Sequence, residues 1–323
     1  MLEEVKACRF LIKCLEIIRQ IIDGAQIPTA ALTTIMMTMI TTMTATAEVT
    51  AATAAAIKNF FGGLTMNQKF YVAGCVFTEG EPALSKKICD YLRGKFSMPI
   101  IRCCVDKYKV AEFEERMPEN YRDEWRAIKH FEKFPPGSTM VSICHNCSAI
   151  FEERHPEIQR ESIWEFILAD KTFPYPDYHG VAITIQVCWR SKENFAEQEA
   201  ARELLRRMNF KVVELEENHE RTKFCGYSLY QPQPPRNPKL APKRFLYGAQ
   251  GLFQEHTPEQ KKSLMLEHCA QIRTEKVAAY CHYCIRGLKL GGAKAFHLAE
   301  LLSKNGEKTP ASLGGGMNRH LTL

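Results

Sequence analysis

The chain has 323 residues, which is enough for two domains with full hydrophobic cores. Its 43 basic and 37 acidic residues give a net charge of +6, and they are scattered along the chain. No basic run with interleaved aromatic residues is present, so nucleic acid is excluded as the natural partner.

The first 66 residues are predicted to form a poorly ordered extension. Residues 3–22 have the periodicity of an amphipathic helix, and residues 25–47 carry no charge. The second stretch is long enough to cross a membrane, but threonine dominates it. We interpret this stretch as a low-complexity leader. A membrane anchor is the alternative interpretation. No convincing signal peptide is present, so we expect a cytoplasmic protein with membrane association unlikely.

From residue 69 onward, short apolar runs alternate with helical patterns. The first group of predicted strands spans 69–74, 98–102 and 138–143. Predicted helices span 81–96, 111–117 and 123–134, and another runs from the third strand through 151 and 158. The turn-rich segment 173–180, with its prolines, then predicts a linker.

After this linker the same order restarts. Predicted strands span 180–187, 211–215 and 276–280, and predicted helices span 194–210, 257–272 and 287–302. Strand–helix alternation on this spacing indicates parallel sheets flanked by helices. We therefore expect an α/β protein with two tandem Rossmann-like cysteine-rich domains at 67–178 and 179–305, followed by a flexible tail at 306–323.

Nine of the thirteen cysteines form one arrangement that occurs twice. In the first copy, Cys75 precedes the pair Cys103–Cys104 and then Cys144-His-Asn-Cys147. In the second, Cys188 precedes Cys225 and then Cys281-His-Tyr-Cys284. Adjacent cysteines and C-x-x-C units in a large chain indicate thiolate ligands in a reducing compartment rather than a disulfide framework.

Most of these cysteines directly follow predicted strands. Because the carboxyl ends of parallel strands form the ligand crevice of an open sheet, we expect each set to converge at one edge of its sheet. The five thiolates of the first set exceed the four that a zinc ion takes, whereas an iron–sulfur cluster can use more. Metal or cluster binding is thus the preferred interpretation, with buried structural thiols as the alternative.

The first cysteine run, C-x27-C-C-x39-C-x2-C, resembles the "CCG" domain of the catalytic B subunit of heterodisulfide reductase. Similar domains occur in the iron–sulfur subunits of bacterial glycolate- and lactate-oxidation complexes. The resemblance covers residues 68–303, as two tandem domains. It implies a noncubane [4Fe–4S] cluster held by five cysteines in each full motif, and cleavage of a disulfide by successive one-electron steps.

Transferred by match, the resemblance assigns cofactor ligands in both halves. The first cluster would be held by Cys75, Cys103, Cys104, Cys144 and Cys147, and the second by Cys188, Cys225, Cys281 and Cys284. The catalytic residues are not identified, and the chemistry is expected at the first cluster.

The sequence departs from this family pattern in three places. Val105 replaces the glycine of the first motif, and Phe224 stands where the second motif has its first paired cysteine. Four thiolates remain there, which suit either a [4Fe–4S] cluster or zinc. The gap before Cys281 is also longer than in the first copy and contains a proline-rich segment, residues 231–245. This segment cannot be regular structure throughout, and we interpret it as a loop that faces a partner or substrate.

Several neighbouring residues have two interpretations each. His145 and His282, inside the C-x-x-C units, either tune or protonate a thiolate site or point to solvent and cap the following helix. Cationic side chains next to the cysteines either offset thiolate charge or are ordinary surface residues. These are Arg102, Lys107 and Arg190. The four remaining cysteines lie on predicted helices and are expected to pack as hydrophobes. These are Cys8, Cys14, Cys89 and Cys269.

No G-x-G-x-x-G motif occurs at a strand–helix junction, so no nicotinamide site is predicted. Electrons would therefore come from flavin or ferredoxin-type iron–sulfur subunits, and a small thiol or disulfide is a possible substrate. The favoured hypothesis is an iron–sulfur oxidoreductase that resembles the catalytic B subunit of heterodisulfide reductase and works within a complex. The alternative is a non-catalytic zinc- or iron–sulfur-binding scaffold or electron-relay subunit.

Overall fold

The computed structural model describes residues 68–102, 110–130, 134–135 and 137–303, all within one compact unit, Asn67–Leu323. The predicted N-terminal extension and C-terminal tail lie outside these residues. So do Cys8, Cys14, Cys103, Cys104 and Lys107. No helix of the described part combines the length and the apolar character needed to cross a bilayer.

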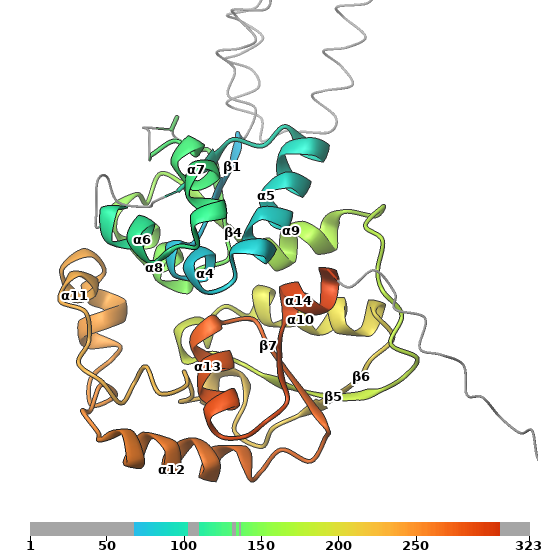
Figure 1. Cartoon of the computed structure of the whole chain (residues 1–323), viewed down its shortest axis with the longest axis vertical. Coiled ribbons are helices and arrows are strands. Elements are labelled where there is room, and N and C mark those ends of the chain that lie inside the picture. The colour runs from blue at the N-terminus through green and yellow to red at the C-terminus, as the bar shows by residue number, and fades with distance from the viewer. Residues whose placement is uncertain (1–67, 103–109, 131–133, 136, 304–323) are drawn as a thin grey trace, which may run out of the picture. The chain divides into compact units, whose positions relative to one another are not determined.

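The first half of this unit is built on a four-stranded parallel sheet (Figure 1). Its strands, β1 (Lys69–Val72), β2 (Ile100–Ile101), β3 (Thr139–Ser142) and β4 (Gln159–Ser162), pair in the order β2-β1-β3-β4. The helices are α4 (Cys75–Gly80), α5 (Pro82–Phe96), α6 (Val110–Arg116), α7 (Glu119–Ala127), α8 (His145–Arg154) and α9 (Ile163–Ala169).

The second half repeats this plan. Strands β5 (Ala182–Gln186), β6 (Lys211–Glu214), β7 (Lys276–Ala279) and β8 (Ala295–His297) pair in parallel in the order β6-β5-β7-β8. The α-helices are α10 (Phe195–Arg207), α11 (Arg236–Leu240), α12 (Pro258–Cys269), α13 (His282–Leu290) and α14 (Leu298–Ser303). A π-helix spans Lys243–Tyr247, and 3₁₀ turns span Trp189–Ser191 and His219–Arg221.

The two sheets confirm the predicted mixed α/β class with parallel strands, and their matching strand order supports the predicted internal repeat. The apolar strands are buried on both faces, as expected of parallel sheets covered by helices. Helices α9 and α10 lie side by side and join the halves (Figure 1). The domain boundaries and the CCG assignment stay predictions.

Three elements differ from the prediction. The helix predicted over 123–134 is wrong in its bounds, because α7 begins at Glu119 and ends at Ala127, after which Lys129 forms a β-bridge with Ile101. The helix predicted over 287–302 is wrong, because the chain leaves α13 at Gly291 and Gly292, forms β8, and only then begins α14. Gly292 has φ of +81°, a backbone conformation that ends a helix. Strand β4 was also not predicted, since its sequence QRES is polar and half of it is exposed at the sheet edge.

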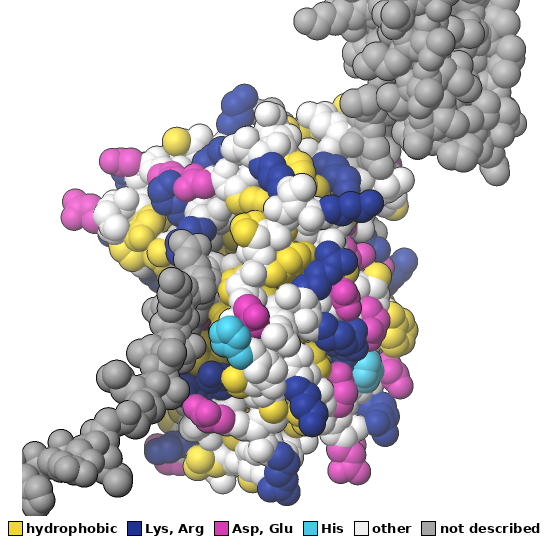
Figure 2. Space-filling model, turned by 90° about the vertical axis from the view of Figure 1, so that its right-hand side faces the viewer, with side chains coloured by type: hydrophobic (Ala, Val, Ile, Leu, Met, Phe, Trp, Pro, Cys, Tyr) yellow, Lys and Arg dark blue, Asp and Glu magenta, His cyan; other side chains and the backbone are white. Residues whose placement is uncertain are grey.

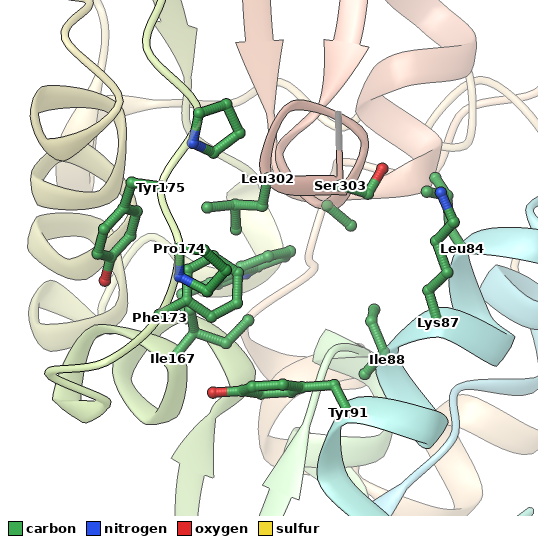
Figure 3. A pocket seen from close by; sticks show the side chains of 13 residues that line it. Leu84, Lys87, Ile88, Tyr91, Ile167, Phe173, Pro174, Tyr175, Leu302 and Ser303 are labelled. Carbon is green, nitrogen blue, oxygen red and sulfur yellow. The ribbon is translucent and has the colours of Figure 1, made fainter. Parts of the chain in front are cut away.

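An apolar cavity of about 460 Å³ lies between α5, α9, the 173–176 linker and α14. Figure 3 shows side chains that line it, including Ile88, Tyr91, Phe173 and Leu302. No motif cysteine lines this cavity, so it is separate from the predicted thiolate chemistry.

Asp170, which follows α9, ties this linker to α5. Its buried carboxylate accepts hydrogen bonds from Lys95, Tyr91 and Thr172. Burial alone would raise the pKa of Asp170, but these hydrogen bonds outweigh it and hold that pKa well below its ordinary value. The stabilisation is therefore fully present above the ordinary pKa of an aspartate and is lost as the pH falls toward the lowered one.

We expect Asp170→Asn to lower the free energy of unfolding by about 1 kcal/mol at pH 7, because the partner Lys95 is partly exposed and screened. The deficit should shrink as the pH falls below about 4, because Asp170 of the unfolded wild-type chain then binds a proton that the folded carboxylate does not, which lowers wild-type stability toward that of the variant. Urea titrations at pH 7 and pH 3 measure both effects. Asp123→Asn, at a carboxylate 97% exposed, is the control and should change neither value; an equal deficit in both variants would contradict this account.

Candidate metal centre

Four cysteines of the second half form a buried group. The Sγ atoms of Cys188, Cys225, Cys281 and Cys284 all lie within 4.8 Å of one another. The residues are between 0% and 5% exposed. They come from three separate segments of the chain, so the fold, rather than local sequence, assembles them.

The strand order explains why these segments meet. Cys188 follows β5 and Cys281 follows β7, and these two strands are neighbours in the sheet. From β5 the chain continues to β6 toward one edge of the sheet, and from β7 it continues to β8 toward the other edge. Such a switch in strand order opens a crevice at the carboxyl ends of the strands. Cys281 precedes α13 and Cys284 lies in its first turn, where the free backbone N–H groups favour thiolates. The segment after β6 supplies Cys225.

Two glycines bring the Cys225 segment against α13. Gly226 has φ of +57°, and a Cβ atom placed on it would lie 2.0 Å from the backbone oxygen of Tyr283. A Cβ atom on Gly287 would lie 2.3 Å from the Cα atom of Gly226. Only glycine fits both positions, so this backbone contact fixes Cys225 beside the C-x-x-C turn.

The pKa values of the four thiols are shifted in different directions. Hydrogen bonds from the other three thiols lower the pKa of Cys281 well below that of an ordinary cysteine. Burial raises the pKa of Cys188 and of Cys284 well above it. Burial also opposes ionisation of Cys225, but the Cys188 thiol and the guanidinium of Arg190 outweigh it and lower that pKa. Metal binding requires all four thiolates, so it must release protons from this group.

Arg190 is the cation of the site. Its side chain is buried, donates hydrogen bonds to Cys225 Sγ and to Ser228 Oγ, and lies over the ring of Tyr283. The predicted charge-offsetting role therefore fits Arg190. Arg102 instead pairs with Glu114, with an N–O distance of 3.0 Å.

We expect Arg190→Met to weaken Zn²⁺ binding at this centre by about 10- to 100-fold at pH 7, because Cys225 loses the cation that lowers its pKa. The pH at which the metal is released on acidification should rise for the same reason. Competition with a chromophoric chelator between pH 5 and pH 8 measures both changes. Arg244→Met is the matched control, since Arg244 pairs with Glu193. Similar affinity losses in the two variants would remove this role for Arg190.

Phe224 occupies the position where the predicted motif has its first paired cysteine. Its ring stacks on that of His268 on α12, with 3.8 Å between centroids. Burial lowers the pKa of His268 to about 4, so this imidazole is neutral at pH 7. At this position the chain therefore has an aromatic contact to a helix of the second half, and the second set has four thiols.

The first cysteine set is described only in part. Cys75, Cys144 and Cys147 are each at most 7% exposed. Cys75 follows β1 and Cys144 follows β3, the positions equivalent to those of Cys188 and Cys281. A Cβ atom on Gly74 would lie 2.9 Å from the Cβ atom of Cys144, so the strand ends meet closely. The predicted ligands Cys103 and Cys104 lie outside the described residues.

Side chains inside the two C-x-x-C units connect the two sets. The buried His145 forms a hydrogen bond with the Cys281 thiol and lies 3.3 Å from a Glu197 carboxylate oxygen. Burial alone would lower the pKa of His145, but Glu197 and Cys281 raise it well above its ordinary value. Tyr283 in turn interacts electrostatically with Cys144. His145 is therefore not a solvent-facing residue, and the two cysteine sets are neighbours.

Three buried polar atoms beside the cysteines form no hydrogen bond among the described residues. They are the Tyr71 hydroxyl, Arg190 Nε and His282 Nε2. Burial, and then the thiols of Cys89, Cys144 and Cys147, raise the pKa of Tyr71 well above its usual range. Polar atoms of a bound inorganic group would satisfy them, although buried polar atoms without a hydrogen bond also occur away from the cysteines in the described part of the chain, at Trp125 and Gln233.

A polar cavity of about 360 Å³ reaches this region. Cys144 of the first set, His145 and Arg190 line it, so it borders the first set and the arginine that contacts Cys225. Its remaining lining is strongly charged. The charged residues are Glu152, Arg160, Glu161, Glu165, Glu193, Glu197 and Arg244. A small polar or charged molecule is the kind of ligand that such a cavity can accommodate.

The second set fits a metal with four thiolate ligands. In a tetrahedral zinc site the sulfur atoms lie about 3.8 Å apart, as Zn–S bonds of about 2.3 Å require. The Sγ atoms of Cys188 and Cys225 are 3.4 Å apart, so this cage matches a single ion. A four-iron cluster requires the four sulfurs to move apart, because each binds a different iron. The donor set itself suits either group.

Among known protein families, no family model matches the chain, and no curated protein matches it either. Its chemistry is therefore inferred from the residues themselves. The predicted ligands of the second half converge as expected. The tertiary contacts of Gly226, Gly287, His145 and Tyr71 were not predicted; the only signal in the sequence was the glycine directly after Cys225 and the histidine inside C-x-x-C.

Proposed function

We propose that the chain is an iron–sulfur oxidoreductase of the same type as the catalytic B subunit of heterodisulfide reductase, built from two tandem CCG-type domains. The observation that carries this proposal is the buried group of four cysteines at the carboxyl ends of parallel strands, next to an equivalent first set. Metal ligation explains why four thiols are buried within 4.8 Å of one another.

The residues around the cysteines support a redox role. A bound cluster supplies one-electron chemistry, and hydrogen bonds to its sulfur atoms set its potential. Arg190 donates to Cys225 Sγ, and its charge offsets the negative charge of buried thiolates. His145 holds a proton between Glu197 and Cys281, at the wall of the polar cavity.

A small disulfide is the proposed substrate. Its reduction takes two electrons and two protons and yields two thiols. The polar cavity borders Cys144 of the first set and Arg190 beside the second, so one ligand in it contacts both regions. Its arginines and carboxylates favour a disulfide with charged ends.

A matched set of variants tests this activity. With reduced methyl viologen as electron donor, the anaerobic protein should oxidise the dye when cystine or oxidised glutathione is added. Cys144→Ala should abolish this reaction. Cys89→Ala, at a buried thiol on α5, should retain it. An iron-containing protein that reduces neither disulfide would instead support the electron-relay alternative.

A second candidate function is a non-catalytic zinc-binding scaffold. The short Sγ–Sγ distances in the second set favour it, since they suit one tetrahedral ion. In that case the protein is colourless and takes no electrons from dithionite. The polar cavity at Cys144 has no role in such a scaffold.

A further inference from the structure

The segment 231–254, between Cys225 and α12, carries a charge of one sign. It contains the four basic residues Arg236, Lys239, Lys243 and Arg244 and no acidic residue. The short helix α11 and the π-helix Lys243–Tyr247 form its ordered centre, and α11 lies against α8 of the first half. This segment is the insertion that distinguishes the second half from the first.

One side of the segment is buried in the protein. Asn237, Ala241, Phe245 and Ala249, spaced four residues apart, are at most 6% exposed. Phe245 packs in the same core cluster as Cys144, Cys147, Cys188, Cys225 and Cys284. The inner side thus lies directly on the core that holds both cysteine sets.

The outer side is exposed and combines apolar and basic side chains. Leu246 is 53% exposed and Tyr247 is 71% exposed, the highest value among the large hydrophobic side chains that the structure describes. Large apolar side chains left this exposed side by side are typical of binding surfaces. Lys239 and Lys243 of the same segment are exposed too, so its outer side offers both apolar and basic side chains.

These two lysines are available to a partner. Arg244 pairs with Glu193, and Glu153 accepts hydrogen bonds from the backbone N–H groups of residues 243 and 244. In the described part of the chain, neither Lys239 nor Lys243 forms an ion pair. Segment 231–254 has basic residues and no acidic ones, whereas on the face shown in Figure 2 basic and acidic side chains are interspersed.

We propose that Lys239, Lys243, Leu246 and Tyr247 form the docking surface for an acidic electron-transfer protein, an inference that rests on the proposed redox function. The sulfur atoms of the second centre are buried, so electrons must cross the protein from a surface contact. Tyr247 is two residues from Phe245, which contacts the cysteine core. Small, electrostatically steered interfaces are typical of electron-transfer encounters.

Stopped-flow reduction by an acidic bacterial 2[4Fe–4S] ferredoxin tests this surface. Lys239→Glu/Lys243→Glu should lower the second-order rate at least 10-fold at low ionic strength, and the salt dependence of the wild-type rate should flatten. Leu246→Ser/Tyr247→Ser should lower the rate at every salt concentration. The control, Lys171→Glu/Lys262→Glu, makes the same charge change at two other exposed lysines and should stay within twofold of wild type.

Iron content and reduction by dithionite are measured in every variant, since dithionite needs no docking surface. If wild type contains no iron and dithionite reduces nothing, the proposed function fails. If dithionite reduces all the proteins but ferredoxin reacts equally with each, or with none, the docking proposal alone is overturned. The docking proposal is also overturned if the lysine variant keeps its reaction with ferredoxin and loses only its binding to phosphatidylglycerol vesicles. The surface would then bind a membrane.

Discussion

Cys284→Ala should empty the second metal centre and lower the free energy of unfolding by at least about 4 kcal/mol. Cys284 is fully buried on α13, and its loss leaves three thiols without the ligand that completes the tetrahedral set. Structural metal sites contribute strongly to folding, and a buried site missing one ligand leaves uncompensated charge. Metal analysis and urea unfolding under anaerobic conditions measure the two losses.

Cys89→Ala is the control for this prediction. Cys89 is also buried, but it lies on α5 and packs in the hydrophobic core, outside the group of four cysteines. Burial raises the pKa of its thiol to about 12, so it is not a thiolate at neutral pH. This variant should keep its metal and lose about 1–2 kcal/mol through the smaller side chain. An unchanged metal content in Cys284→Ala would exclude the four-cysteine centre as the binding site.

Gly226→Ala should have an effect of similar size without removing any ligand. The new Cβ atom would overlap the Tyr283 backbone oxygen at 2.0 Å, and its positive φ adds strain of about 1–2 kcal/mol. The Cys225 segment must then move away from α13, so we expect loss of metal together with at least about 4 kcal/mol of stability.

Gly251→Ala separates the clash from the strain. Gly251 also has a positive φ, of +76°, but a Cβ atom there meets nothing within 4 Å. It should lose only about 1–2 kcal/mol and keep the full metal content. If Gly226→Ala behaves like Gly251→Ala in both measurements, the backbone contact between Gly226 and Gly287 does not position Cys225.

The sequence predicted the parts of the fold that local pattern determines. The apolar runs before Cys75, Cys144, Cys188 and Cys281 identified four parallel strands, and the strand ends then located these cysteines. Strand β4 could not be predicted, because its polar residues lie at an exposed sheet edge. Little of the strand is buried there, so its sequence lacks the alternation of apolar and polar residues that indicates a strand. The predicted helix 287–302 is wrong in its middle, because the glycines at 291 and 292 end α13 and β8 follows them before α14 begins.

The candidate site could be predicted only as far as its ligands. The contact between His145 and Cys281 joins the two halves, and no local pattern indicates which halves face each other. Arg190 was one of several cations near cysteines, and only its buried position beside Cys225 separates it from Arg102. The replacement of a cysteine by Phe224 was visible, whereas its stacking on His268 depends on the position of α12.

The most direct test of the proposed function is the content of iron, zinc and acid-labile sulfide in the anaerobically purified full chain, together with its visible spectrum. The proposal predicts a brown protein with broad visible absorption that dithionite bleaches, and iron and sulfide in nearly equal amounts. Cys284→Ala should lose part of both, and Cys89→Ala none. A colourless protein with zinc and no iron or sulfide would contradict the redox function and leave the metal-binding scaffold.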